Sequence, residues 1–261
     1  MPNDITFSVV IPAYNAERTI VRAVESCVSQ SLQPKEVIVV DDGSSDGTVE
    51  LLRSHFGDNI RIIQLPQNCG ASAARNAGMA AATASYIAFQ DADDIWHPKK
   101  LEMIQQALVT PDDVYALFHD YTLSRSRWEE SARPGTLRPY PLWKLLLSNP
   151  IGTPCTVIRN VKGAYLFDEN LHHMEDYDFF LRIAADHGIS HLDRALTLLD
   201  RPILSEGGLS SSRWDMRKGE LRVLAKLARS KPAIMPAYPF LAIWGLGKHL
   251  VKSFFPPRRN Y

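Results

Sequence analysis

The chain reads Phe89-Gln90-Asp91-Ala92-Asp93-Asp94-Ile95-Trp96 where an apolar run gives way to acids. The preceding run, residues 86–89, is typical of a buried strand. Three carboxylates so close together repel one another unless a cation, an arginine or water compensates their charge, and Mg²⁺ and Mn²⁺ prefer carboxylate oxygens as ligands. Asp is also common in surface turns and at helix N-termini. The stretch by itself therefore leaves both a metal site and a simple turn open.

The residues before this stretch alternate between apolar runs and helical patterns. We expect strands near residues 7–11, 36–40, 60–65 and 85–89, separated by helices near residues 17–29, 48–56 and 72–82. Strands that alternate with single helices require right-handed parallel crossovers, in a sheet that is covered on both faces. The sequence therefore predicts an α/β fold with a Rossmann-like half and a mostly parallel sheet.

Polar residues follow each of the four expected strands: Tyr14 and Asn15, Asp41 and Asp42, Asn68 with Arg75, and Asp91 and Asp93. Ligands of such sheets bind beyond the carboxyl ends of the strands, so we expect these residues to line one crevice. The chain has no Gly-x-Gly-x-x-Gly after the first strand and no Gly-x-x-x-x-Gly-Lys-Ser/Thr. We therefore expect a metal and side chains to hold any phosphate.

The second part of the chain is less regular. We expect a helix over residues 98–108, then strands at 115–121 and 155–158, helices at 142–147 and 175–185, and an irregular loop at 124–141. Residues 232–247 carry no charge, but they contain three prolines and fall short of the ~20 apolar residues of a membrane helix. Basic residues then alternate with apolar ones: Lys248, Lys252, Arg258 and Arg259. This pattern suits contact with anionic lipid or a helix packed on the domain, and both remain open.

Composition narrows the class of protein and its compartment. Lys plus Arg and Asp plus Glu are both 29, so no global field attracts nucleic acid, which we do not expect as a partner. The three cysteines are widely spaced, which favours reduced thiols. The first residues lack the pattern of a signal peptide, and we expect a cytoplasmic protein, peripheral at the inner face of the cell membrane if the C-terminal segment contacts lipid.

Five motifs occur together in the order of a known family. They span residues 9–15 (VVIPAYN), 40–48 (VDDGSSDGT), 68–78 (NCGASAARNAG), 90–94 (QDADD) and 167–182 (FDE followed by EDYDFFLR). This set resembles the family 2 inverting glycosyltransferases over about residues 5–215. The resemblance implies a GT-A fold in residues 1–215, with a nucleotide-sugar half at 1–110 and an acceptor half at 111–215. Residues 216–261 would form a short helical extension. Contact of this extension with the membrane is one of the two interpretations left open above.

The resemblance also implies a donor site. Asp42 would accept a hydrogen bond from the base, and Tyr14 offers a ring for stacking. Asp93 would bind Mn²⁺ or Mg²⁺ in a D-x-D motif, while Asp91 would lie near the ribose or sugar and Asp94 would support the turn. The expected donor-binding residues are Pro12, Ala13, Tyr14, Glu17, Asp42, Arg75 and Asp91. An arginine in a helix is often only solvated, but the family pattern directs Arg75 toward phosphate or the acids.

The other half of the reaction needs a base, because a sugar hydroxyl must lose its proton as it attacks. The family's Glu-Asp pair matches Glu175-Asp176, with Asp176 as the catalytic base and Glu175 in support. A helix N-terminus stabilises a carboxylate, so an acidic cap is the plain alternative. One departure is that the family's Arg-x-His is Arg201-Pro-Ile here, so that the histidine is missing; the run 205–212 is a candidate substitute or lid.

The leading hypothesis is an inverting glycosyltransferase that moves a hexosyl or N-acetylhexosaminyl group from a nucleotide-diphosphate sugar to a hydroxyl. The expected donor is a UDP-sugar. The acceptor would be a glycan or a lipid-linked precursor in cell-surface polysaccharide synthesis. A non-catalytic nucleotide-sugar binding module is the alternative. A nucleotidyltransferase would place a glycine-rich basic loop after the first strand, and this chain has none.

Overall fold

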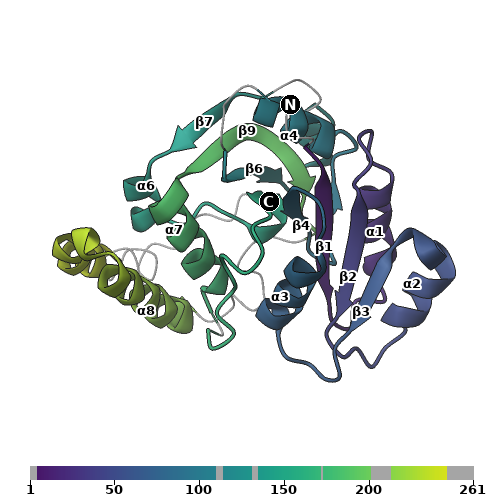
Figure 1. Cartoon of the computed structure of the whole chain (residues 1–261), viewed down its shortest axis with the longest axis horizontal. Helices are drawn as coiled ribbons and strands as arrows, with labels where there is room; N and C mark the ends of the chain where they lie inside the picture. The colour runs from purple at the N-terminus through teal and green to yellow at the C-terminus, as the bar shows by residue number, and fades with distance from the viewer. Residues whose placement is uncertain (1–4, 110–113, 131–134, 172, 201–212, 246–261) are drawn as a thin grey trace.

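The computed structural model describes residues 5–109, 114–130, 135–171, 173–200 and 213–245 (Figure 1). Its strands are β1 (Phe7–Ala13), β2 (Glu36–Asp41), β3 (Arg61–Gln64), β4 (Tyr86–Phe89), β5 (Ile95–Trp96), β6 (Ala116–Thr122), β7 (Leu137–Tyr140), β8 (Thr156–Arg159) and β9 (Ile189–Leu198). Its helices are α1 (Ile20–Val28), α2 (Thr48–Phe56), α3 (Ala71–Ala81), α4 (Lys100–Val109), α5 (Arg125–Glu130), α6 (Leu142–Leu147), α7 (Glu175–His187) and α8 (Arg213–Ser230). Three short 3-10 turns are η1 (Gly57–Asn59), η2 (Thr153–Cys155) and η3 (Pro232–Ala237).

The strands form one sheet in the order β3-β2-β1-β4-β8-β6-β9-β5, with β7 paired to β9. The strands β3, β2, β1 and β4 are all parallel, so the predicted Rossmann-like half is confirmed. Beyond β4 the pairs are antiparallel, except for the parallel pair of β6 and β9. The sheet therefore changes character at β4, the strand that ends in the acidic stretch.

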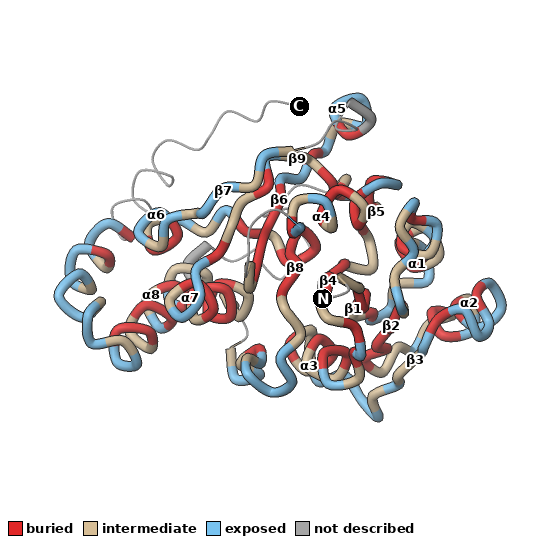
Figure 2. The backbone as a smooth tube through the Cα atoms, turned by 45° about the horizontal axis from the view of Figure 1, so that its top comes forward, coloured by how far each residue is buried: buried red, intermediate tan, exposed pale blue. Residues whose placement is uncertain are grey.

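Alternate residues of the central strands point to opposite faces of the sheet and belong to two hydrophobic cores. Val10 packs under α3 and α7, whereas Val9 and Ile11 pack under α1. This division follows from the two-residue period of a strand. Figure 2 shows that the central strands are buried along most of their length, as expected for a sheet covered on both faces.

Three features after β4 differ from the sequence-based expectation. Ile95 and Trp96 form a two-residue strand directly after the acids, paired with β9. The expected loop at 124–141 contains α5 and β7, and β7 pairs antiparallel with β9. The ten-residue β9 has a weak strand pattern of its own, and its pairs with β5, β6 and β7 hold it in the sheet.

The helix α8 follows as expected from the sequence and packs against α7 (Figure 1). Among the described residues, no helix combines the length and the apolarity needed to cross a bilayer. The Arg201 motif, the run at 205–212 and the basic residues from Lys248 onward lie outside the described residues.

Gly78 of α3 packs closely against the sheet. A Cβ at this position would lie 2.4 Å from Val10 Cγ1, and Val10 is fully buried in the sheet. Overpacking typically costs ~1–3 kcal/mol. The better helix propensity of alanine stabilises the folded state by about 1 kcal/mol, which offsets only part of this cost. We therefore expect Gly78→Ala to reduce the free energy of unfolding in chemical denaturation.

The matched control is Gly152→Ala. Gly152 has φ −93°, and the nearest neighbour of its Cβ would be Pro154 Cδ at 3.9 Å. Equal stability of the two variants would show that α3 can move away from the sheet without cost.

Candidate functional site

The carboxyl ends of β1, β2, β3 and β4 lie along one edge of the sheet, because these strands are parallel neighbours. The polar residues singled out in the sequence leave the sheet at this edge: Tyr14 and Asn15 after β1, Asp42 after β2, Asn68 after β3, and Asp91 and Asp93 after β4. Pro12 and Ala13 are the last two residues of β1. The strand ends therefore lie side by side, as the pattern of the sequence predicts.

Hydrogen bonds join the loop after β1 to the loop after β2. Asn15, with φ +48°, donates its backbone N–H to Ser44 Oγ at 2.9 Å. Glu17 Oε2 accepts the N–H of Gly47 at 3.1 Å. Tyr14, which directly precedes Asn15, is half exposed, so its ring is accessible to a ligand. Glu17 thus shapes the loop that presents Tyr14.

Asp42 is buried and already holds the loop after β3. Its Oδ1 accepts the N–H of Cys69 at 2.7 Å, and its Oδ2 accepts the N–H of Gly70 at 2.8 Å. Gly70 has φ +92°, a conformation that favours glycine. A carboxylate has about four acceptor positions, so Asp42 retains capacity for an N–H of a ligand.

Arg75 connects the end of β4 to the start of α7. It lies buried on α3, and its Nη2 donates to Asp91 Oδ1 at 3.0 Å, while its Nη1 lies 3.8 Å from Glu175 Oε1. Burial lowers the pKa of the guanidinium, but Asp91 and Glu175 raise it by more, so the pKa of Arg75 is raised overall. Arg75 therefore remains a buried cation between two carboxylates from opposite parts of the chain.

Asp176 is the second residue of α7, and Met174 is the N-cap. Asp176 Oδ1 accepts the N–H of Tyr177 at 2.6 Å. Burial, together with the charge of Glu175, raises the pKa of Asp176 to about 7. A carboxylate that only stabilises a helix N-terminus should have a lowered pKa. The raised pKa instead suits a group that exchanges a proton near neutral pH.

The third acid of the opening stretch turns into the protein. Asp94 is buried, its Oδ1 accepts the N–H of Asp200 at 3.1 Å, and its carbonyl oxygen accepts from Gln90 Nε2 at 2.7 Å. Burial and the charges of Asp91 and Asp93 raise the pKa of Asp94 to about 8. Asp94 therefore supports the turn.

Arg22 also holds this turn, and sequence reasoning missed it. Its Nη2 donates to the carbonyl oxygen of Asp93 at 3.1 Å and forms an ion pair with Asp200. The only signal was a cation on the expected first helix, and its carboxylate partner lies 178 residues away. No local pattern could have identified this contact.

Within the described residues, no group of three or more His, Cys, Asp or Glu side chains is arranged to hold a metal ion. Mg²⁺ in phosphate sites is usually bound by one or two carboxylates, with phosphate oxygens and water completing its shell. Asp91 and Asp93 are both partly exposed at the end of β4. These two side chains fit a divalent cation that is shared with a bound diphosphate.

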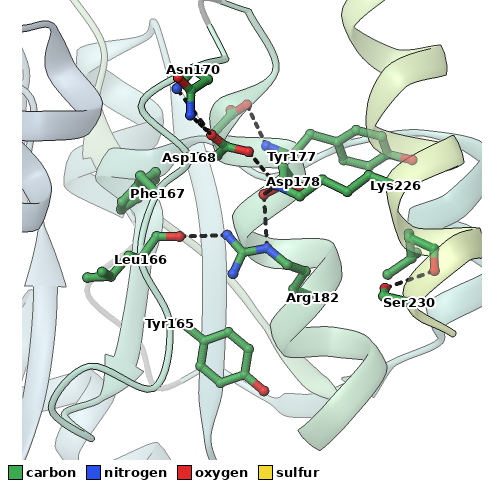
Figure 3. A network of polar contacts seen from close by, with 12 residues as sticks. Tyr165, Leu166, Phe167, Asp168, Asn170, Tyr177, Asp178, Arg182, Lys226 and Ser230 are labelled. Atoms are coloured by element: carbon green, nitrogen blue, oxygen red, sulfur yellow. Dashed lines mark hydrogen bonds and ion pairs between the residues drawn. The ribbon is translucent and has the colours of Figure 1, made fainter.

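A polar network beside the site fixes the position of α7 (Figure 3). Lys226 of α8 contacts Asp168 Oδ2 at 2.5 Å and Asp178 Oδ2 at 3.1 Å. Asp178 is buried and also accepts from Arg182 Nε at 2.9 Å, while Arg182 Nη2 donates to the carbonyl oxygen of Leu166 at 2.6 Å. Asp178 is therefore structural, as expected from its place two residues after Asp176.

The same network reaches α3 through Phe167. The rings of Phe167 and Phe179 stack at 4.0 Å. Asn76 exchanges two hydrogen bonds with the backbone of Phe167, at 2.8 and 2.9 Å. Because Asn76 follows Arg75, one connected set of contacts joins α8, α7 and the buried arginine.

We expect Lys226→Met to destabilise the protein by about 1–2 kcal/mol, because it removes charged hydrogen bonds to two carboxylates, one of them buried. Chemical denaturation would measure the loss, and Lys226→Arg should restore most of it. Arg222→Met, an exposed change on the same helix, is the control. If both methionine variants were equally stable, Lys226 would not hold α8 on α7.

Comparisons with known proteins give the relatives of this chain. A family model described as Glycosyl transferase family 2 matches residues 8–165. The chain is 27% identical to WfgD of Escherichia coli, a UDP-Glc:alpha-D-GlcNAc-diphosphoundecaprenol beta-1,3-glucosyltransferase, over 95% of this chain and 96% of WfgD. It is 32% identical to a glycosyltransferase of Haemophilus influenzae, over 67% of this chain and 70% of that protein. Several other relatives match over only 30–35% of their own length.

Solved structures share the fold. The 1–349 fragment of TarS from S. aureus superposes with TM-score 0.67 at 21% identity, covering 97% of this chain and 74% of that fragment. The mannosyltransferase PcManGT from Pyrobaculum calidifontis, solved with GDP-Man and Mn2+, gives TM-score 0.61 at 18% identity, covering 98% and 79%. The expected GT-A fold is confirmed.

Proposed function

This chain belongs to glycosyl transferase family 2, and on that premise we propose that it transfers a sugar, with inversion, from a UDP-sugar to a hydroxyl group. The acceptor is a glycan or a lipid-linked precursor of a cell-surface polysaccharide. The relative WfgD, which uses UDP-Glc and a diphosphoundecaprenol-linked acceptor, supports this choice of substrates.

The observation that carries the proposal is the contact of Arg75 with both Asp91 and Glu175. Asp91 lies at the carboxyl end of β4, where ligands of such sheets bind. Glu175 precedes Asp176, whose raised pKa suits a base. The arginine therefore brings the proposed base to the proposed donor edge.

The donor is held at three places in this proposal. Asp42 accepts the N–H of the base, and Pro12 and the exposed ring of Tyr14 flank the base, with Ala13 between them in the chain at the end of β1. Asp91 lies near the ribose or the sugar. Arg75 supplies a buried positive charge beside the diphosphate. Glu17 acts through the loop that presents Tyr14.

Asp93, with Asp91 beside it, is the proposed metal ligand, and the metal is Mn²⁺ or Mg²⁺. When bound, the cation neutralises the charge that develops on the leaving nucleotide. PcManGT and glucosyl-3-phosphoglycerate synthase of Mycobacterium tuberculosis are both solved with Mn2+, which supports a divalent cation in this chain.

Asp176 accepts the proton of the acceptor hydroxyl as its oxygen bonds to the anomeric carbon. The bond from that carbon to the diphosphate oxygen breaks at the same time, and the nucleotide leaves with the electron pair. Glu175 keeps the pKa of Asp176 high, and Arg75 holds Glu175 in place. A single displacement of this kind inverts the anomeric centre.

We also propose the division of the chain. Residues 1–110 bind the donor, residues 111–215 bind the acceptor, and residues 216–261 form the C-terminal extension. The protein would act at the cytoplasmic face of the membrane, where a lipid-linked acceptor is in reach.

The test uses the purified full-length chain with UDP-Glc, UDP-GlcNAc and GDP-Man, Mn²⁺, and a lipid extract that contains polyprenyl-diphosphate sugars. Mass spectrometry should detect a lipid-linked product one sugar larger with one of the UDP-sugars. Binding of a donor by calorimetry without any product would favour the alternative, a nucleotide-sugar binding module.

A further inference from the structure

Large apolar side chains are exposed near the end of the described chain. Phe240 is 60% exposed, Ile243 70% and Trp244 45%, and Trp143 of α6 is 59% exposed. Contiguous apolar patches on a protein surface mark sites of interaction. We call these four residues the C-terminal apolar surface.

Three of them share one face of a helix. Residues 238–245 are helical, and Phe240, Ile243 and Trp244 have the spacing i, i+3 and i+4. The rings of Phe240 and Trp244 stack at 6.4 Å. Leu241 points the other way and is buried in the core with α7 and α8. The helix is therefore apolar on its outer face as well as on the face that it packs against the protein.

The fourth residue lies beside them on α6. Trp244 Nε1 donates to the carbonyl oxygen of Leu147 at 3.3 Å. Leu147 is four residues after Trp143, so both lie on the same side of α6. Lys144 Nζ lies 5.6 Å from the ring of Trp143. The surface thus joins two segments that are about a hundred residues apart in the sequence, and it includes a cation beside an indole.

The charge of the neighbouring sequence indicates what covers this surface. Residues 221–261 contain no Asp or Glu. They contain eight Lys or Arg: Arg222, Lys226, Arg229, Lys231, Lys248, Lys252, Arg258 and Arg259. Lys226 pairs with Asp168 and Asp178. Lys231 pairs with Asp186, so the positive charge that can attract lipid comes from the other six. Since the whole chain has 29 of each sign, the preceding residues carry an excess of acids. Segments that lie at an anionic lipid interface typically combine tryptophan and phenylalanine with lysine and arginine.

We propose that the C-terminal apolar surface docks on an anionic lipid bilayer, with its aromatic rings at the level of the headgroups. The role of this contact, to bring the active site to a lipid-linked acceptor, rests on the proposed function. The contact itself does not.

The test is co-sedimentation of the full chain with vesicles of phosphatidylcholine alone and with 30% phosphatidylglycerol, at about 50 and about 500 mM salt. We expect binding to the anionic vesicles, weakened by the higher salt. The double substitution Phe240→Ser and Ile243→Ser should lower the partition coefficient at least tenfold. Val109→Ser with Val161→Ser, which removes two exposed valines elsewhere, should leave it unchanged. Circular dichroism would establish that both variants fold.

A second measurement uses brominated lipids, which should quench the fluorescence of the wild type more strongly than that of Trp143→Phe. Absence of binding to anionic vesicles at low salt would overturn the proposal, as would equal binding by the two double variants. A concentration-dependent dimer that is lost in the Phe240 and Ile243 variant, without lipid binding, would assign the surface to a second copy of the chain. Donor hydrolysis is measured in parallel, so failure of lipid binding is distinguishable from failure of the proposed function.

Discussion

Asp176→Asn is expected to reduce sugar transfer by roughly 10²–10⁴-fold, the usual contribution of a general base. The amide is close in size to the carboxylate but cannot accept the proton of the acceptor hydroxyl. Donor binding should change little, because Asp176 is the proposed base for the acceptor hydroxyl and its carboxylate accepts the N–H of Tyr177. Initial rates and calorimetry with UDP would measure the two effects separately.

The pH profile tests the same assignment. Transfer requires the ionised form of Asp176, and its pKa is raised to about 7. The rate should therefore fall about tenfold per pH unit below this pKa and level off above it. Burial and Glu175 raise the pKa, while Arg75 lowers it. Glu175→Gln removes a like charge, so it should move the acidic limb to lower pH.

The control for both measurements is Asp58→Asn, which neutralises an exposed carboxylate on η1. It should match the wild type in rate and in pH profile. Full transfer by Asp176→Asn would remove Asp176 from the mechanism. An acidic limb that does not move in Glu175→Gln would mean that another group titrates in this range.

The elements of the first half could be predicted because their signals are local. The strand predicted at 36–40 is found at Glu36–Asp41, and the helix predicted at 72–82 is found at Ala71–Ala81. Each has its own hydrophobic period, and the strands pair in parallel, as single-helix crossovers require. Local pattern and tertiary structure agree in this part of the chain.

The strand β7 shows why the second half was harder. Leu137–Tyr140 contains an arginine and a proline, which are poor signals for a strand. It is held in the sheet by β9, about fifty residues later, with Leu137 opposite Leu192. Such a pairing depends on register between distant segments, which no sequence window contains.

The same difference between local and long-range signals applies to the residues of the candidate site. The residue types at the strand ends could be predicted, because carboxylates after apolar runs are visible in the sequence. The ion pairs around the site could not be predicted, since the pairs of Arg22 with Asp200 and of Lys226 with Asp168 join segments that are far apart in the sequence. The sequence indicated the acids at the strand ends and the buried Arg75, but not Arg22 and Lys226, whose contacts hold the neighbouring turn and helix.

Asp93→Ala is expected to lower metal-dependent transfer by about 10²-fold or more, since stabilising the charge of a leaving group is worth several kcal/mol. Mn²⁺ should increase the affinity of the wild type for UDP in calorimetry, and this increase should be lost in the variant. Chelation of the metal should reduce the wild type toward the rate of the variant and leave the variant itself unchanged.

Asp94→Ala separates this effect from damage to the turn, because Asp94 is buried and alanine cannot accept the N–H of Asp200. We expect it to reduce stability while Mn²⁺ still increases UDP affinity. Asp91→Asn should weaken donor binding in the presence and in the absence of metal, because it also removes the negative charge that pairs with Arg75. If Mn²⁺ still increased UDP affinity in Asp93→Ala but not in Asp91→Asn, the two aspartates would have exchanged roles. If it did so in both, the acidic stretch would not bind the metal at all, and the arginine of α3 would be the remaining positive charge at the diphosphate.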